Sequence, residues 1–284
     1  MGADTVTAAS SQERPRSVPF HRQVLAFARR SLQELLHDRS ALFWSLLMPV
    51  FFFVLFGLGQ GGGGNGRELA ALAVSFGFFG SLTVTLVAFA QTLTGDLQVK
   101  RYRKLRSLPI SPTADLLGRF LAGYLLSVAS FAIVVGVGAI AGGRYALRSP
   151  ISPIVVLVAL LLFALVGTSI AVLVATSLHD SGYVLAVSNV VLMGLFFLTG
   201  YNGVVPQMAP GPLSAVLNVV PNSLATRIAI YHVVDVGTDP DALSPPSLPG
   251  EPVYVLLLAA WAVGLLAVSG ALLGRFVYDG DGGE

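Results

Sequence analysis

Long apolar blocks separated by short polar segments run along most of the chain. Almost no charged residue lies within them, and their approximate bounds are 41–58, 69–93, 114–141, 154–178, 183–198 and 253–273. A helix needs roughly 20 mostly apolar residues to cross the hydrocarbon core of a bilayer. Several of the blocks reach that length. The pattern therefore predicts an all-α polytopic membrane protein with six transmembrane helices.

Residues 20–40 carry a different pattern, with apolar residues on one helical face and polar residues on the other. The apolar positions are Phe20, Val24, Phe27, Ala28, Leu32, Leu35 and Leu36. The basic residues of the polar face and its end are Arg22, Arg29, Arg30 and Arg39. An amphipathic helix of this kind lies in the membrane interface. A surface helix on a soluble domain is the alternative, but the sequence offers no soluble core for it to cover.

The segment before the last block is broken by prolines at positions 206, 210, 212 and 221. A short helix over 224–234 follows, capped by Asn222 or Ser223. Eleven or so residues are too few to span a bilayer, so a broken, re-entrant or interfacial segment is expected. Residues 235–252 are acidic and rich in proline, which indicates a solvated loop.

The two ends of the chain are polar. Residues 1–19 lack an apolar stretch and contain Pro, Ser and Thr, which predicts a disordered cytoplasmic tail and no cleaved signal peptide. We therefore expect one membrane domain over 20–278, followed by a short tail at 279–284.

The amino-acid composition is also typical of an integral membrane protein. Hydrophobic residues make up 54% and charged residues only 11%, whereas a soluble domain carries about 25% charge. The chain has no cysteine, which excludes disulfides and thiolate chemistry.

Basic residues are distributed unevenly between the connections. If the N-terminus is cytoplasmic, the outer side holds four of the 17 basic residues, namely Arg67, Arg144, Arg148 and Arg227. The other thirteen then lie inside: Arg14, Arg16, Arg22, Arg29, Arg30, Arg39, Lys100, Arg101, Arg103, Lys104, Arg106, Arg119 and Arg275. Basic loops stay in the cytoplasm. Both termini of this multi-pass protein of the cell membrane are therefore predicted to be cytoplasmic.

Residues that could support chemistry are scarce. The spans lack the intramembrane carboxylates or histidines of proton-driven carriers. The glycines at 61–64 lack the pattern of a phosphate-binding loop, and the four histidines lack metal-ligand spacing. His179, Asp180 and Ser181 are adjacent, which favours a polar turn over a catalytic triad. The chain is not expected to be an enzyme or to hold a cofactor.

The loop after the second block carries the most informative motif. It reads Lys104-Leu105-Arg106-Ser107-Leu108-Pro109, and the third block opens with Leu117-Gly118-Arg119. In this order, with the amphipathic helix and the broken segment, the chain resembles the ABC-2 type transporter permeases, including daunorubicin-resistance-like drug and lipid exporters. The glycine that usually follows an acidic residue before the basic run is absent here, although Asp96 can take the acidic place.

The resemblance implies a permease subunit of an ATP-binding-cassette exporter. Such a subunit pairs with a second copy or a homologous permease, and two cytoplasmic ATPases bind ATP and Mg. Membrane lipid is a further partner, and nucleic acid is not. The amphipathic helix and the loop after the second span would contact the ATPases, and residues 96–107 are expected to form a short cytoplasmic helix that docks on them. The loop residues expected to couple are Leu97, Lys100, Arg101, Arg103, Lys104, Leu105, Arg106 and Leu108.

The substrate is less well defined by the sequence. Polar residues among the later spans could line a translocation path: Thr168, Ser169, Asn189, Thr199, Tyr201 and Asn202. These few uncharged groups in apolar surroundings suit an amphipathic or lipid-like substrate. A membrane assembly factor or a channel without an ATPase is the alternative function, and an intramembrane hydrolase is a third.

Overall fold

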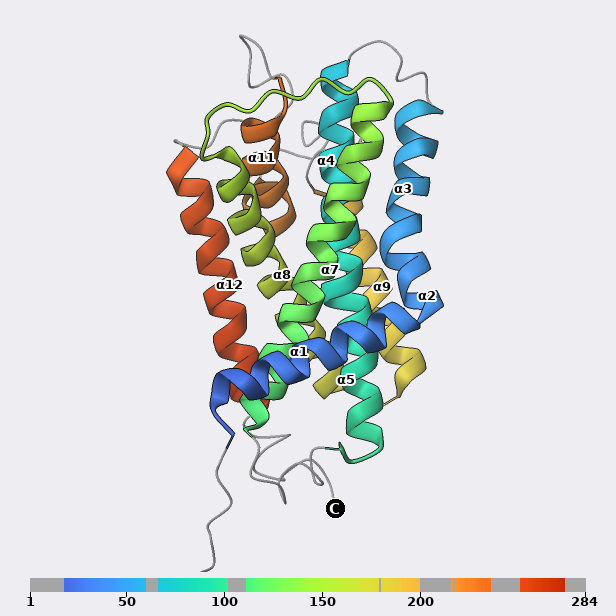
Figure 1. Ribbon diagram of the computed structural model, residues 1–284, viewed down its shortest axis with the longest axis vertical. Coiled ribbons are helices and arrows are strands. Elements are labelled where there is room, and N and C mark those ends of the chain that lie inside the picture. The colour runs from blue at the N-terminus through green and yellow to red at the C-terminus, as the bar shows by residue number, and fades with distance from the viewer. Residues whose placement is uncertain are drawn as a thin grey trace, which may run out of the picture.

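The computed structural model describes residues 18–59, 66–101, 111–178, 180–199, 216, 218–235 and 251–273. Within these ranges every regular element is a helix, and a single pair, Tyr145 and Val234, forms an isolated β-bridge. Most helices stand side by side as a bundle, and α1 (Phe20–His37) lies across one end of it (Figure 1). The expected all-α architecture is confirmed.

Each apolar block coincides with a helical run. The first run contains α2 (Arg39–Leu42), η1 (Phe43–Leu47), α3 (Met48–Phe53) and η2 (Val54–Leu58). The second contains α4 (Gly66–Leu82), η3 (Thr83–Ala88) and α5 (Phe89–Gln98). The others are α7 (Pro112–Ile140), α8 (Ser152–Ser177), α9 (Ser181–Phe197) and α12 (Glu251–Leu273). The labels η mark π-helical turns, and the ends differ from the expected bounds by a few residues.

Four helices of the described chain are long and apolar enough to cross a membrane: Gly66–Gln98, Thr113–Ile140, Ser152–Ser177 and Pro252–Leu273. The first and fifth blocks form shorter apolar helices, Phe43–Leu58 and Ser181–Phe197. At about 1.5 Å per residue, the 17 residues of α9 cover about 25 Å, less than a hydrocarbon core of roughly 30 Å. The count of six spans therefore stays a prediction.

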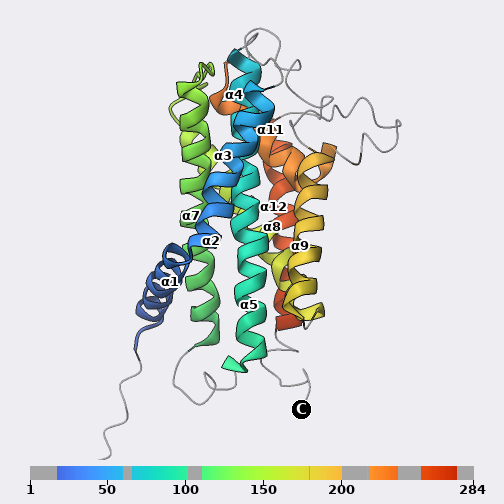
Figure 2. The same cartoon turned by 90° about the vertical axis from the view of Figure 1, so that its right-hand side faces the viewer.

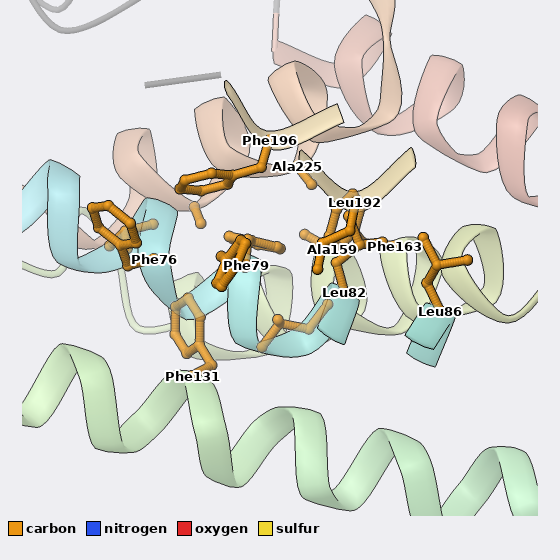
Figure 3. Close-up of a cluster of buried hydrophobic side chains, with 14 of the residues drawn as sticks. Phe76, Phe79, Leu82, Leu86, Phe131, Ala159, Phe163, Leu192, Phe196 and Ala225 are labelled. Carbon is orange, nitrogen blue, oxygen red and sulfur yellow. The ribbon is translucent and has the colours of Figure 1, made fainter. Parts of the chain in front are cut away.

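Helix α4 lies at the centre of the bundle and is buried along nearly its whole length. Aromatic rings surround it (Figure 3). The ring of Phe196, on α9, lies 5.0 Å from Phe76 and 4.7 Å from Phe79, centroid to centroid. Phe131 of α7 and Phe163 of α8 each lie 5.4 Å from Phe78. A helix with neighbours on every side must be apolar all round, which explains the absence of a polar face on α4.

Pro49 is accommodated inside the first helical run by its neighbour α7. Proline has no backbone N–H, so the carbonyl of Ser45 cannot accept the hydrogen bond that an α-helix would supply from position 49. The hydroxyl of Ser130 donates to that carbonyl at 2.6 Å instead. Gly80 makes room for the pair, since a Cβ there would lie 2.1 Å from Ser130 Oγ and 3.0 Å from Pro49 Cγ.

The short helix expected before the last block is α11 (Pro221–Val233), which packs against α4, α8 and α12 and is almost entirely buried. The expected cap is wrong. Val220 occupies the N-cap position, and no side chain caps this helix. Asn222 instead donates to the carbonyls of Leu195 at 3.1 Å and Thr199 at 3.0 Å. The last carbonyls of α9 lack partners within their own helix, which is why an amide is useful there.

The described basic residues form two groups, one at each end of the bundle. At the end near α11, Arg144 N donates to Gly66 O at 2.7 Å and Arg148 N to His232 O at 3.1 Å. Arg67 and Arg227 belong to α4 and α11 at this α11 end. The described basic residues expected on the other side lie at the α1 end: Arg22, Arg29, Arg30, Arg39, Lys100, Arg101 and Arg119. This separation matches the expected partition, and which end faces the cytoplasm stays a prediction.

Candidate functional site at the α1 end

Helix α1 rests on α7 at a glycine. A Cβ on Gly118 would lie 2.5 Å from Phe27 Cβ, 2.7 Å from Ala28 N and 2.9 Å from Val24 O. Such distances are too short for any side chain larger than hydrogen. Figure 2 shows α1 standing against the lower part of α7 in this way. The close approach gives the glycine of the Leu117-Gly118-Arg119 motif a physical role, namely seating α1.

The other face of α1 carries its charges outward. Arg22, Arg29 and Arg30 of α1 are all exposed, as is Arg39 at the start of α2. Arg30 Nε pairs with Glu34 Oε1 at 2.7 Å. Gln23 Oε1 accepts a hydrogen bond from Ser111 N at 2.9 Å. Ser111 immediately precedes α7 and ends the basic loop. Helix α1 is therefore attached both to α7 and to the last residue of that loop.

Four charged side chains form a closed ring between the end of α5 and the start of α7. Arg101 Nη1 lies 2.9 Å from Asp96 Oδ2, and Arg101 Nη2 lies 3.5 Å from Asp115 Oδ1. Arg119 Nε lies 3.0 Å from Asp115 Oδ2, and Arg119 Nη2 pairs with Asp96 Oδ2. Each arginine thus contacts both carboxylates. We call these four residues the charge ring.

Burial makes the pairing within the charge ring important. The exposed fractions of the side chains are 1% for Asp115, 7% for Arg119, 16% for Arg101 and 17% for Asp96. A charge removed from water is costly unless it is paired and hydrogen-bonded. Two positive and two negative groups leave the ring neutral. The ring therefore holds the end of α5 against the first two turns of α7.

The helix that leads into the basic loop ends earlier than the sequence predicts. A single short helix was expected over 96–107, but Asp96 and Leu97 belong to α5, which ends at Gln98. Lys100 then adopts a left-handed φ of 51°, which breaks the helix there. Of the expected coupling residues, Leu97 packs on the core, Lys100 is exposed and Arg101 joins the charge ring. The rest lie outside the described residues: Arg103, Lys104, Leu105, Arg106 and Leu108.

A cavity of about 750 Å³ lies beside the charge ring. Its wall comes from α1, α2, η1, α3, α4, η3, α5, α7 and α9, and it includes Arg119 of the ring. The large apolar side chains of the wall are Leu35, Trp44, Phe52, Phe79, Val84, Val87, Phe89, Leu185, Leu192 and Met193. The polar ones include Ser31, Glu34, Asp38, Thr83, Gln91, Thr92 and Asn189. A volume of this size, mostly apolar with a few polar groups, is typical of small-molecule sites.

The residues expected to line a translocation path are not all brought together. Asn189 lies in the cavity wall. Thr168 and Ser169 of α8 do not belong to the wall, and their buried hydroxyls have no hydrogen-bond partner among the described residues. Thr199 contacts Asn222 at the junction of α9 and α11. Tyr201 and Asn202 lie outside the described residues. The role of each in transport stays a prediction.

The wall residues missed by sequence reasoning had no local signal. Trp44, Phe52 and Phe79 sit in apolar blocks and look like core or lipid-facing positions in sequence. They reach one cavity only because the first, second and fifth apolar blocks approach each other. The polar turn expected at 179–181 is supported by Asp180. Its carboxylate caps α9 by accepting from Gly182 N at 2.8 Å and Tyr183 N at 3.1 Å.

A comparison with known protein families gives a match that covers most of the chain. A sequence model of a family described as ABC-2 type transporter matches residues 22–232. The matched range contains nearly all of α1, the whole charge ring and the cavity wall. No match was found among curated proteins.

Proposed function

The chain belongs to the ABC-2 type transporter family, whose members are multi-pass membrane subunits of transporters, and from this premise we propose its role. It forms the translocation path of an ATP-driven exporter for an amphipathic or lipid-like substrate. A separate cytoplasmic ATPase binds ATP and Mg and supplies the energy. The absence of a phosphate-binding motif from the sequence supports this division of labour.

One observation carries the proposal. Helix α1 and both ends of the basic loop, Arg101 and Ser111, are attached at the first two turns of α7, beside the cavity. Gly118 seats α1, Ser111 bonds Gln23, and Arg119 belongs both to the charge ring and to the cavity wall. A force applied to α1 or to the loop therefore reaches the cavity wall through a single rigid junction.

The mechanism follows from this junction. The ATPase docks at the α1 end, which faces the cytoplasm as the 13-to-4 distribution of basic residues indicates. Basic residues of α1, of the start of α2 and of the loop provide the electrostatic contacts: Arg22, Arg29, Arg30, Arg39, Lys100, Arg103, Lys104 and Arg106. Leu105 and Leu108 provide the apolar contacts. Leu97 does not, because it packs on the core of the bundle.

Closure of the ATPases on ATP then moves the loop. Because the charge ring joins α5 to α7, the two helix ends move together rather than separately. Their displacement changes the shape of the cavity and releases the substrate toward the α11 end. A second copy of the chain, or a homologous permease, completes the path, as the resemblance to exporter subunits implies.

The loop contact is tested by comparing Leu105→Asp with Arg103→Ala. Loss of a buried leucine costs roughly 1.5–3 kcal/mol, whereas an exposed charge pair contributes about 0–1 kcal/mol. We expect Leu105→Asp to abolish pull-down of the ATPase and substrate export, and Arg103→Ala to weaken both only slightly. Equal membrane levels of both variants serve as the control.

Normal association and export by Leu105→Asp would contradict the coupling role. A chain that exports its substrate with no ATPase present would instead be a channel. A chain that never associates with an ATPase, and whose loss disrupts another membrane complex, would be an assembly factor.

A further inference from the structure

Helix α1 lies at the level of the lipid head groups. The 29 residues of α7 cover about 43 Å at about 1.5 Å per residue, which matches a bilayer of roughly 40–45 Å with its head groups included. Helix α1 is attached near the start of α7, between Ser111 and Gly118. Figure 2 shows it on the outer side of α7, opposite α9 and α12. One long side of α1 therefore borders the lipid.

Two contacts with α7 fix the rotation of α1 about its own axis. Gln23 accepts a hydrogen bond from Ser111 N, at the end of the basic loop. Ala28 approaches Gly118, about two helical turns deeper in the bundle. Turning from Gln23 past Phe27, which faces α7, to Ala28 thus leads from the loop side of α1 to its bilayer side. At about 3.6 residues per turn, the positions that come next in this rotation are Leu32, Leu25, Leu36, Arg29 and Arg22.

The leucines on the bilayer side of α1 form an apolar edge, which consists of Leu25, Leu32 and Leu36. Leu25 is 59% exposed and Leu36 50%, and Leu32 is half-buried. Exposed apolar side chains at the head-group level are stabilised by entering the hydrocarbon region. Arg22 and Arg29 follow the apolar edge around the helix and are exposed. They lie at the border between lipid and water, where an arginine reaches the head groups.

The two arginines are arranged to hold a phosphate group. Leu25 lies between them on the same helix face, three positions after Arg22 and four before Arg29. Neither arginine forms a salt bridge among the described residues. The acidic residue of α1 is Glu34, which pairs with Arg30 on the loop side of the helix. A guanidinium group donates two parallel hydrogen bonds to phosphate oxygens. An anion at this border thus meets positive charge that no carboxylate of α1 balances.

We propose that Arg22 and Arg29 bind the head-group phosphate of an anionic phospholipid. The acyl chains of this lipid lie against the apolar edge of α1. A basic residue near an anionic membrane surface favours binding by about fivefold. The pair therefore selects an anionic phospholipid over a zwitterionic one, in which an ammonium group balances the phosphate.

The bound lipid narrows the surface of α1 that remains for the ATPase. Arg30 lies on the loop side of α1 and Arg39 at the start of α2, so both stay within direct reach of a docked ATPase. Arg22 and Arg29 contribute less to docking, because the lipid phosphate balances their charge. The lipid site goes beyond the export function and rests on it only for the leaflet concerned, which is the cytoplasmic one.

The apolar edge can be probed one position at a time, since the chain has no cysteine. Leu25→Cys places a thiol on the edge, and Ala26→Cys places one on the exposed side away from the bilayer. Both variants are reconstituted without ATPase in nanodiscs of phosphatidylcholine and phosphatidylglycerol. We expect a water-soluble maleimide to modify Ala26→Cys about tenfold faster, because lipid disfavours the reactive thiolate. Equal rates, or protection of Leu25→Cys only after the ATPase is added, would overturn the proposal.

The choice of lipid is measured with a bimane label attached to Leu25→Cys before reconstitution. The nanodiscs contain equal amounts of phosphatidylglycerol and phosphatidylcholine, and the acyl chains of one or the other lipid carry bromine as a quencher. We expect brominated phosphatidylglycerol to quench the label severalfold more strongly than brominated phosphatidylcholine. Equal quenching by the two lipids would overturn the proposal, because the edge would then contact lipid without selecting an anion.

Arg29→Gln and Arg30→Gln form a matched pair, since they remove the same charge at adjacent positions of α1. Arg29→Gln should remove most of the preference for phosphatidylglycerol, and Arg30→Gln should leave it nearly unchanged. An equal loss in both variants would show a diffuse attraction to the membrane and would refute the site. The two proposals fail separately. Normal export by Leu105→Asp would contradict the coupling role of the loop and leave the lipid site intact, whereas equal quenching by the two lipids would do the reverse.

Discussion

Ser130 of α7 donates a hydrogen bond of 2.6 Å to the backbone carbonyl of Ser45, four residues before Pro49. The bond replaces the one that Pro49 cannot make. It also joins the first helical run to α7, the helix that carries the charge ring and the seat of α1. A proline in a membrane helix is thus tolerated because a neighbouring helix supplies the missing donor.

Replacement of Ser130 by alanine should destabilise the bundle. The carbonyl of Ser45 would lose this donor, and a hydrogen bond typically contributes about 0.5–1.5 kcal/mol to stability. The midpoint temperature of unfolding in detergent measures the loss. Ser127→Ala is the matched control, because Ser127 Oγ reaches Ser81 O only at 3.4 Å. An equal effect of the two substitutions would contradict the role given to Ser130.

Neutralisation of one member of the charge ring should loosen the junction of α5 and α7. In Asp96→Asn, two guanidinium groups share a single carboxylate. Removal of one partner of a fully buried pair costs about 3–5 kcal/mol. Because the side chain of Asp96 is 17% exposed, the loss should lie nearer the lower value. Thermal unfolding measures it, and substrate-stimulated ATPase activity of the assembled exporter should fall in parallel.

The exposed pair of Arg30 and Glu34 is the control for the charge ring. Its side chains are 54% and 53% exposed, and such pairs contribute about 0–1 kcal/mol. Glu34→Gln should therefore leave the unfolding temperature nearly unchanged. A stability loss as large as that of Asp96→Asn would show that burial does not govern the effect.

A methyl group at Gly118 should displace α1. The added Cβ would meet Phe27 Cβ at 2.5 Å and the backbone of α1 at 2.7 and 2.9 Å. Limited trypsin digestion should cut after Arg29 and Arg30 faster in Gly118→Ala than in the unchanged chain. The same substitution at Gly136 on α7 meets nothing within 4 Å. It should leave digestion unchanged and stabilise the helix by up to about 1 kcal/mol. Faster digestion of both variants would argue against a specific seat.

The orientation of the chain in the membrane can be determined directly, since the chain has no cysteine. Single cysteines at Ser107 and Ser247 probe the basic loop and the long acidic loop. With an impermeant thiol reagent on intact cells, Ser247→Cys should react and Ser107→Cys should react only after lysis. The reverse pattern would place the α1 end outside and would contradict the orientation on which ATPase docking depends.

Features set by short stretches of chain could be predicted from the sequence. The apolar blocks gave the positions of the main helices because continuous apolar composition over many residues suits a helix in lipid. The amphipathic pattern that begins at Phe20 predicted α1, because apolar residues at helical spacing within one short stretch are enough to define such a helix. The motif around Gly118 and Arg119 indicated the family. The cap assigned to Asn222 failed because its amide serves the end of α9, a contact that no neighbouring residue reveals.

The functional assembly, in contrast, was decided by packing between distant segments. Asp96 and Arg119 lie 23 positions apart in the sequence and meet only because α5 and α7 lie against each other. Trp44, Thr83 and Asn189 share one cavity through three separate helices. Sequence periodicity tells which face of a helix avoids water, but every neighbour in a membrane bundle is apolar. Which helices touch, and where their few polar groups meet, therefore depends on close packing, such as the approaches that Gly80 and Gly118 permit and the contacts of the Phe196 ring.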